Sequence, residues 1–353
     1  MVKEDKYDMP IIYKDNTILK EAYSLTKDLQ NPKVTLFWSD FFLSAIIGYF
    51  FLFVSMKNSN YYIESGSVCI IIFSLYRAIS FIHEIAHIKV GYLKGFKLAY
   101  NIFIGIPLLL PSFLYERVHS LHHMKTRYGT DKDPEYLPFA RLKPWVLLSS
   151  IFLSLFAPLG LVFRFGILTP LSYLIPSLRQ VVIVRFSALT INPQFRRQLL
   201  PKDMPKEWKL IEGAASLWSI IIIFSIIAGK ISVHEIIIIY IAASGIAFVN
   251  HIRTISAHLW ESDGSQLTVI DQYLDSVNFP RPAIFPALWA PVGLRYHALH
   301  HLLPSIPYHN LAEAHRRITL AMQPDSVYHK VNYTNWLRLV RGILSFHDRQ
   351  DSI

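Results

Sequence analysis

The chain has 353 residues, of which 52% are hydrophobic and only 17% are charged, whereas soluble domains are about a quarter charged. Its single cysteine, Cys69, excludes an intrachain disulfide and any Cys-x-x-Cys motif. The net charge of +10 comes from lysines and arginines that lie between apolar runs rather than along one stripe. This pattern is typical of the cytoplasmic flanks of membrane spans, and it disfavours a nucleic-acid partner.

Two apolar runs, residues 34–56 and 66–82, predict a first helical hairpin that crosses the bilayer twice. Residues 1–33 carry six lysines, whereas the link between the two runs carries only Lys57. The positive-inside rule therefore places the N-terminal segment in the cytoplasm and the link outside. Cys69 lies inside the second run, where a packed thiol is expected.

Two further runs, residues 98–115 and 145–178, are interrupted by prolines. Residues 214–229 and 231–250 then predict a second hairpin, and the last hundred residues read as a polar cap on the cytoplasmic side. The sequence therefore predicts an all-α integral membrane protein. It should have two transmembrane helical hairpins (about four spans), interfacial or re-entrant helices, and a cytosolic helical cap.

Most of the fifteen histidines are clustered. Spacings of three and four residues place side chains on one helical face, so each cluster can direct two imidazoles at one point. Eight imidazoles are too many for one ion, so the pattern predicts two metal ions, although imidazole suits zinc, copper, iron and nickel alike. The three clusters are His83 and His87; His119, His122 and His123; and His297, His300 and His301.

A ninth ligand is expected after the second hairpin, where Asn250, Thr254 and His258 repeat every four residues along one helical face. His258 is the preferred ligand. His251 lies on roughly the same face and is either a further ligand or a histidine outside the metal sphere. Because all clusters must meet on one side of the membrane, residues 98–115 cannot form a single span, and residues 145–178 form either two short spans or none.

The three clusters closely resemble the histidine boxes of the membrane fatty acid desaturase and hydroxylase superfamily. The boxes read His83-EIA-His87, His119-SL-His122-His123 and His297-AL-His300-His301, and the segment HHLLPSIPYHNL from His300 is also typical. The resemblance implies a di-iron site at the cytoplasmic face, with O2 as co-substrate. The N-x-x-x-H pattern of stearoyl-CoA desaturases is matched by His258, but Thr254 stands at the asparagine position, and Asn250 is one turn earlier.

On this resemblance, residues 34–320 form the desaturase-like domain, residues 1–33 a cytosolic N-terminal segment, and residues 321–353 a cytosolic C-terminal tail. Acyl-lipid desaturation is the first choice of reaction, followed by lipid or sphingoid hydroxylation and by carotenoid hydroxylation or ketolation. The sequence lacks an H-P-G-G haem stretch, so electrons should come from a separate ferredoxin or cytochrome b5-type donor. A bacterial inner membrane is favoured over the endoplasmic reticulum.

Two other classes of function match parts of this pattern. His83-Glu84-Ile-Ala-His87 also satisfies the H-E-x-x-H motif of zinc proteases, but a protease leaves six clustered histidines without a role. A metal transporter should hold its ligands within the spans near the midplane, whereas these histidines lie at span ends and in the cap.

Acidic residues near the boxes could accept the second ring N–H of a ligand histidine and so orient it. The remaining histidines are expected elsewhere: His234 on the outer side, His309 and His315 near the site, and His329 and His347 in solvent. The acidic residues considered for the orienting role are Glu84, Glu116, Asp131, Asp133, Glu261 and Asp263.

Overall fold

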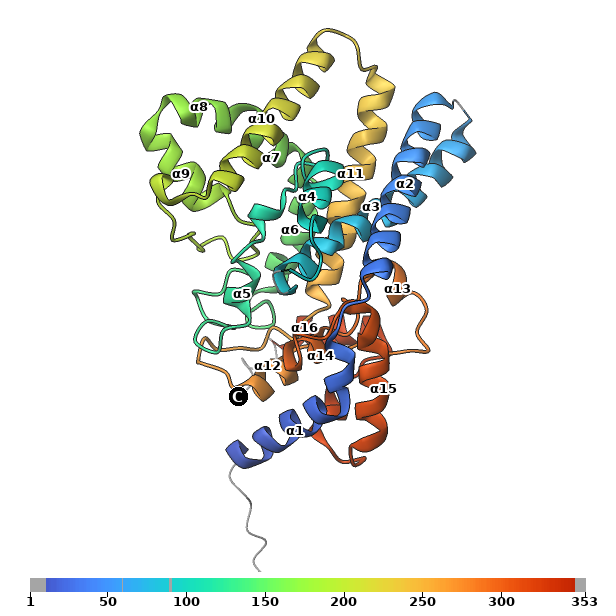
Figure 1. Ribbon diagram of the computed structural model, residues 1–353, viewed down its shortest axis with the longest axis vertical. Coiled ribbons are helices and arrows are strands. Elements are labelled where there is room, and N and C mark those ends of the chain that lie inside the picture. The colour runs from blue at the N-terminus through green and yellow to red at the C-terminus, as the bar shows by residue number, and fades with distance from the viewer. Residues whose placement is uncertain (1–10, 59, 89–90, 347–353) are drawn as a thin grey trace, which may run out of the picture.

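The computed structural model of the protein describes residues 11–58, 60–88 and 91–346. These residues form helices and irregular segments, with isolated β-bridges but no extended strand among them. Long helices make up the upper part of Figure 1, and shorter helices form a cap below them. The predicted all-α class is therefore confirmed.

The two predicted hairpins are formed by the four longest helices, and α11 lies against both α2 and α3. Their outer faces expose large apolar side chains such as Leu43, Ile46 and Phe53. A surface of this kind suits lipid rather than water. The four helices are α2 (Val34–Lys57), α3 (Tyr61–His87), α10 (Lys206–Ile227) and α11 (Val233–Ile255).

Two charged side chains inside the first hairpin pair with each other. Arg77 of α3 donates from Nε to Asp40 Oδ1 of α2 at 2.7 Å. Tyr308 of the cap donates its hydroxyl to the other oxygen of Asp40 at 2.9 Å. Charges at membrane depth need such partners, and here the pair also ties the cap to the hairpin.

The region from residue 144 to 186 is more broken than a simple span. Its central stretch, Ala157–Leu174, is long and apolar enough to cross a membrane, which raises the number of such stretches in the described chain to five rather than the expected four. This stretch contains a π-turn. The helices that precede and follow the stretch are separate from it. The elements are α6 (Pro144–Ser154), α7 (Ala157–Phe163), η4 (Arg164–Leu168), α8 (Thr169–Leu174) and α9 (Pro176–Phe186).

A buried ionic cluster holds this region against α10, in the upper left of Figure 1. Glu212 of α10 is fully buried and accepts hydrogen bonds from Arg164 and from Arg179, both at 2.6 Å. Removing one partner of such a cluster would leave a buried charge uncompensated. The cluster lies apart from the clustered histidines and serves to fix the fold.

Residues 98–115 do not form a span, as expected. They contain part of α4 (Phe96–Tyr100), the π-turn η2 (Asn101–Gly105) and the short η3 (Ser112–Leu114). Asn101 closes the returning chain, because its side chain accepts from the Ser112 amide at 2.8 Å and donates to the Ser112 hydroxyl at 2.9 Å. Gly105 is required here, since a Cβ atom would lie 2.9 Å from Pro111 Cα.

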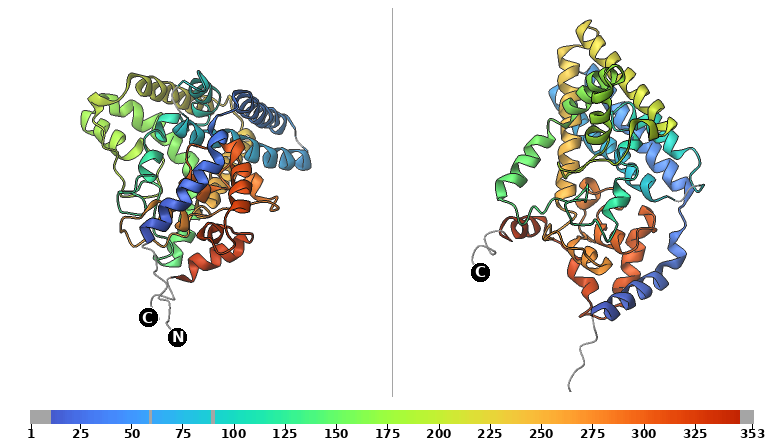
Figure 2. Two further views of the ribbon diagram at one scale, coloured as in Figure 1. Left: turned by 60° about the horizontal axis from the view of Figure 1, so that its bottom comes forward. Right: turned by 90° about the vertical axis from the view of Figure 1, so that its left-hand side faces the viewer.

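The cap combines both ends of the described chain, as Figure 2 also shows. Ala22 and Leu29 from the N-terminal segment pack in the same apolar cluster as Leu311 and Ile318 of α15. Helix α5 (His119–His122) contacts α3, and η5 (Pro201–Asp203) contacts α9. The cap elements are α1 (Ile11–Thr26), η1 (Lys27–Gln30), α12 (Val269–Asp275), α13 (Pro286–Trp289), α14 (His297–Leu302), η6 (Tyr308–Asn310), α15 (Leu311–Ala321), η7 (Val327–Val331) and α16 (Trp336–Leu344).

One expectation about packing is wrong. Cys69 is exposed on α3 rather than packed, because it lies on the outer face of the helix, beside the exposed Ile70. An apolar run marks burial in lipid as readily as burial in protein, so hydropathy alone does not separate the two.

Candidate functional site

Four segments that are distant in the sequence deliver the clustered histidines to one place. The last turns of α3 supply His83 and His87, and the turn after α11 supplies His258. Helices α5 and α14 are short, and each presents histidines three or four residues apart. The rings of His83 and His300 lie 4.4 Å apart between centroids, so the first and last boxes are in contact.

We define the first histidine group as His83, His87, His119, His123 and His300. The nitrogens that could bind an ion lie within 4.8 Å of one another for all of these except His123. His123 completes the group, because its Nε2 is 3.0 Å from His119 Nε2 and 3.1 Å from His300 Nε2.

The second histidine group consists of His122, His258, His297 and His301, all of them buried. His297 Nε2 lies 3.1 Å from both His258 Nε2 and His301 Nε2. Together the two groups contain all nine histidines that the sequence predicts as ligands. Helices α5 and α14 contribute to both groups, so neighbouring residues of one helix turn serve different centres.

The nitrogen geometry fits two metal ions. Two imidazole ligands at right angles and about 2.1 Å from one ion would be about 3.0 Å apart, which is the separation found within each group. Both ring nitrogens of His83 and the Nε2 of His87 are buried without a hydrogen-bond partner. Such burial is costly unless the lone pair is used, and a bound cation would use it.

Carboxylates hold the outer nitrogens of two ligands on α5. His119 Nδ1 lies 3.0 Å from Glu135 Oε1 and 2.9 Å from the Tyr115 hydroxyl, which itself donates to Glu135. His122 Nδ1 lies 2.9 Å from Asp133 Oδ2. These contacts select the tautomer that turns Nε2 towards the centre of each group.

The outer ring nitrogen of His258 is held by hydroxyl groups. The Tyr128 hydroxyl is 2.8 Å from His258 Nδ1 and donates to Asp275 Oδ2 at 2.8 Å. The Ser276 hydroxyl is 3.2 Å from the same ring nitrogen. The turn after α11 is thus tied to α12, which supplies Asp275.

The electrostatics favour neutral ligands, the form that binds metal. Burial, together with the neighbouring histidines, lowers the pKa of His119, His123, His297, His300 and His301 well below the usual value. At His122 burial also lowers the pKa, but the Asp133 carboxylate outweighs this and the pKa is raised. Burial raises the pKa of Glu135 and of Asp275 to about 7.

Among the acidic residues considered from the sequence, Asp133 takes the expected role. Glu84 lies 3.8 Å from His83 Nδ1, too far for a hydrogen bond, and accepts from the Tyr308 amide at 3.1 Å instead. Glu116 pairs with Lys97, and Asp263 accepts from the Ser265 amide. Asp131 contributes its backbone carbonyl to Asn192, and the Glu261 amide donates to Asp275.

Glu135 and Asp275 were not anticipated. Glu135 follows Asp133 by two residues and could have been considered because it lies near the second box. Asp275 is seventeen positions after His258, on another helix, and no spacing rule connects them. Only the folded chain brings it to the site.

The three residues predicted as possible additions to His258 lie in different surroundings. His251 lies beside α6, with its Nε2 2.9 Å from the Ser150 hydroxyl, and it belongs to neither histidine group. Asn250 is exposed, so its side chain does not reach the ligands. Thr254 is buried, one turn before His258.

The other histidines lie away from both groups. His234 pairs with Glu64 at 2.9 Å at the start of α11, at the far end of the spans. His309 accepts from the Lys33 amide, and His315 contacts the Tyr328 hydroxyl. His329 contacts the Gln323 carbonyl on the surface, and His347 lies outside the described residues.

A search among known proteins gave two informative matches. A family model described as fatty acid desaturase matches residues 65–332. A protein named "Ceramide hydroxylase" from Caulobacter vibrioides (strain NA1000 / CB15N) is 43% identical over 318 residues, which are 90% of this chain and 90% of that protein. No solved structure matches the chain.

Proposed function

Because this chain belongs to the fatty acid desaturase family, we propose that it is a membrane oxidoreductase that hydroxylates a lipid of the ceramide type. The observation that carries the proposal is the identity of 43%, spread over 90% of both chains, with a protein named as a ceramide hydroxylase. Desaturation was the first choice from the sequence. The relative favours the alternative, lipid hydroxylation.

The two histidine groups fit a pair of iron ions, five imidazoles around the first and four around the second. Iron bound there would supply the redox chemistry by which one oxygen atom of O2 enters a C–H bond and the other is reduced to water. The two electrons needed would come from a separate donor of the ferredoxin or cytochrome b5 type.

The residues of this chain supply position and shielding. Asp133, Glu135 and the pair Tyr128–Asp275 hold the ligand rings by their outer nitrogens. The second group is buried throughout, which excludes bulk water from the reacting atoms. We further propose that the cap faces the cytoplasm of a bacterial inner membrane, where the lysines of the N-terminal segment would lie.

The proposal is tested by expressing the chain in a bacterium that also makes ceramides and analysing the lipids by mass spectrometry. Hydroxylation adds one oxygen atom to the amide-linked lipid, whereas desaturation removes two hydrogen atoms. We expect the oxygen gain, and we expect its loss in a His301→Ala variant but not in a His329→Ala variant of equal expression. Desaturated lipid in place of hydroxylated lipid would contradict the assignment.

A further inference from the structure

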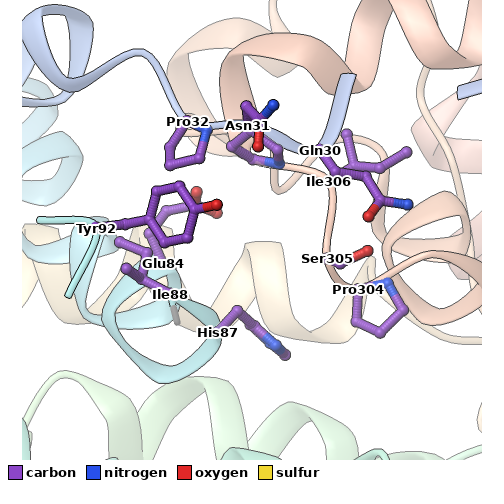
Figure 3. Close-up of a pocket in the computed structure, with 11 residues that line it drawn as sticks. Gln30, Asn31, Pro32, Glu84, His87, Ile88, Tyr92, Pro304, Ser305 and Ile306 are labelled. Carbon is purple, nitrogen blue, oxygen red and sulfur yellow. The ribbon is translucent and has the colours of Figure 1, made fainter. Parts of the chain in front are cut away.

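A pocket opens beside the first histidine group, and His87 of that group forms part of its wall. Figure 3 shows its lining, in which His87 lies below Glu84 and Tyr92 on one side, with Gln30 and Ser305 on the other. Its walls come from three segments: the residues just before α2, the end of α3, and the loop after the third histidine box. A candidate ligand of the metal is therefore directly accessible from this pocket.

The position of the pocket relative to the spans indicates what could enter it. Asn31 and Pro32 precede the first residue of α2, and His87 is the last residue of α3. Both helix ends lie on the cap side of the hairpin. The pocket therefore lies where apolar spans give way to polar protein, which is the depth at which lipid head groups reside.

The chemistry of the lining suits a neutral polar group. Gln30 offers a carboxamide whose Nε2 is buried without a hydrogen-bond partner, and a buried donor of this kind is costly to leave unpaired. Asn31, Tyr92 and Ser305 add an amide and two hydroxyl groups. The charged residue among those that line the pocket is Glu84, whose carboxylate would repel a phosphate.

We propose that this pocket holds the neutral head of the lipid substrate, an amide flanked by hydroxyl groups, with Gln30 donating to one of its oxygens. The proposal rests on the lipid hydroxylase function argued above. It has a consequence for the position of attack. With the head bound beside His87, the C–H bond that reaches the first histidine group lies only a few bonds from the amide, not in the middle of the chain.

The first experiment locates the new oxygen atom by fragmentation of the hydroxylated lipid. Oxygen within a few carbons of the amide is expected, and oxygen near the middle of either chain would overturn the pocket while leaving the hydroxylase function intact. Absence of any oxygenated lipid would instead contradict the function itself. Gln30→Leu should raise the KM for the lipid about tenfold with a smaller effect on kcat, as expected for lost ground-state binding.

Gln323→Leu is the matched control, since Gln323 is exposed in the cap and away from the pocket. An unchanged KM in Gln30→Leu, with normal iron content and expression, would contradict a role for Gln30 in binding. Equal losses in both variants would do the same, because they would indicate a general effect on the cap.

A second experiment measures occupancy without relying on turnover. The single cysteine, Cys69, is replaced by serine, and Ser305→Cys introduces one thiol at the exposed rim of the pocket. The rate of maleimide labelling is compared with and without a short-chain ceramide in micelles. We expect the lipid to slow labelling several-fold at position 305 but not in a Leu320→Cys control on α15, where Leu320 is exposed.

Labelling at position 305 that is unaffected by ceramide, yet slowed by a phospholipid of the same chain length, would overturn the assignment of a neutral head group. Labelling unaffected by either lipid would show that no lipid occupies the pocket and would likewise overturn the proposal.

Discussion

The two histidine groups are built from shared helices but rest on different parts of the molecule. The first group takes His83 and His87 from α3, a helix of the membrane hairpin. The second group takes no ligand from a span, and its His258 and His122 are each held by a carboxylate or tyrosine from outside the hairpins. One centre is thus positioned by the membrane part and the other by the cap, with α5 and α14 joining them.

The two groups also differ in how their ligands are restrained. Neither ring nitrogen of His83 has a hydrogen-bond partner, whereas His258 Nδ1 has two hydroxyl groups within 3.2 Å. Hydrogen bonds therefore hold His119 of the first group and His122 and His258 of the second, whereas His83 relies on the rigidity of α3. Substitutions in each group should reveal this difference between the two groups.

Loss of one ligand from each group should separate the two centres. We expect His87→Ala and His258→Ala each to retain about one of the two irons and to lose activity by more than about 100-fold, beyond the range of outer-partner changes. Iron per chain is measured by plasma mass spectrometry on purified protein, with His329→Ala as control. Complete loss of both irons in either variant would show that the groups do not bind independently.

Removal of one outer carboxylate should act on one group at a time. Asp133→Asn should weaken the second centre and Glu135→Gln the first, each by roughly 10–100-fold in metal affinity. The iron remaining is followed as a chelator is added, and exposed Asp263→Asn provides the control. If both variants release the same iron, the assignment of His119 and His122 to different groups is wrong.

Tyr128→Phe removes the hydroxyl that joins His258 to Asp275. A buried carboxylate then loses a donor, so we expect a loss of about 1–3 kcal/mol in unfolding free energy and earlier release of iron from the second group. Thermal unfolding in detergent measures the change, and exposed Tyr61→Phe at the far end of α3 is the comparison. Equal midpoints for the two variants would contradict the restraint.

Tyr308→Phe tests the dependence of the first group on the hairpin. The variant loses the hydroxyl bond to Asp40 but keeps the amide bond to Glu84. We expect about 1 kcal/mol of lost stability and, since that energy corresponds to roughly a five-fold change, a loss of iron up to roughly five-fold faster from the first group only. Faster loss of iron from the second group instead would contradict the dependence of the first group on the hairpin.

The sequence was sufficient to predict the candidate ligands that the structure brings together, because metal ligation requires fixed residue types at short helical spacings. His258 could also be predicted from the sequence, since Asn250, Thr254 and His258 repeat every four residues along one helical face. Apart from Asp133, the groups that orient the histidine rings could not be predicted from the sequence. An orienting carboxylate needs only to contact a ring nitrogen, so it can come from any segment of the chain. Asp275 illustrates this, as it arrives from α12 across the site.

The fold also has some features that the sequence predicted and others that it did not. Hydropathy predicted both hairpins, and the need for the histidine clusters to meet on one side predicted that residues 98–115 do not span, which the Asn101–Ser112 bonds now explain. The shared site predicted two short spans or none in residues 145–178, whereas one stretch, Ala157–Leu174, is long and apolar enough to span. Hydropathy did not predict that Arg164 in this stretch is compensated by Glu212 from another helix. Nor did it separate Cys69 on the outer surface from the packed face of α3.

Local composition and spacing in the sequence thus predicted the membrane character, the hairpins and the nine histidines that are candidate ligands. The tertiary structure decided which histidine joins which group, since His119 and His122 are one turn apart yet belong to different centres. It also formed the pocket beside His87 from three distant segments. Contacts between remote parts of a chain depend on the packing of the whole, and no local pattern encodes them.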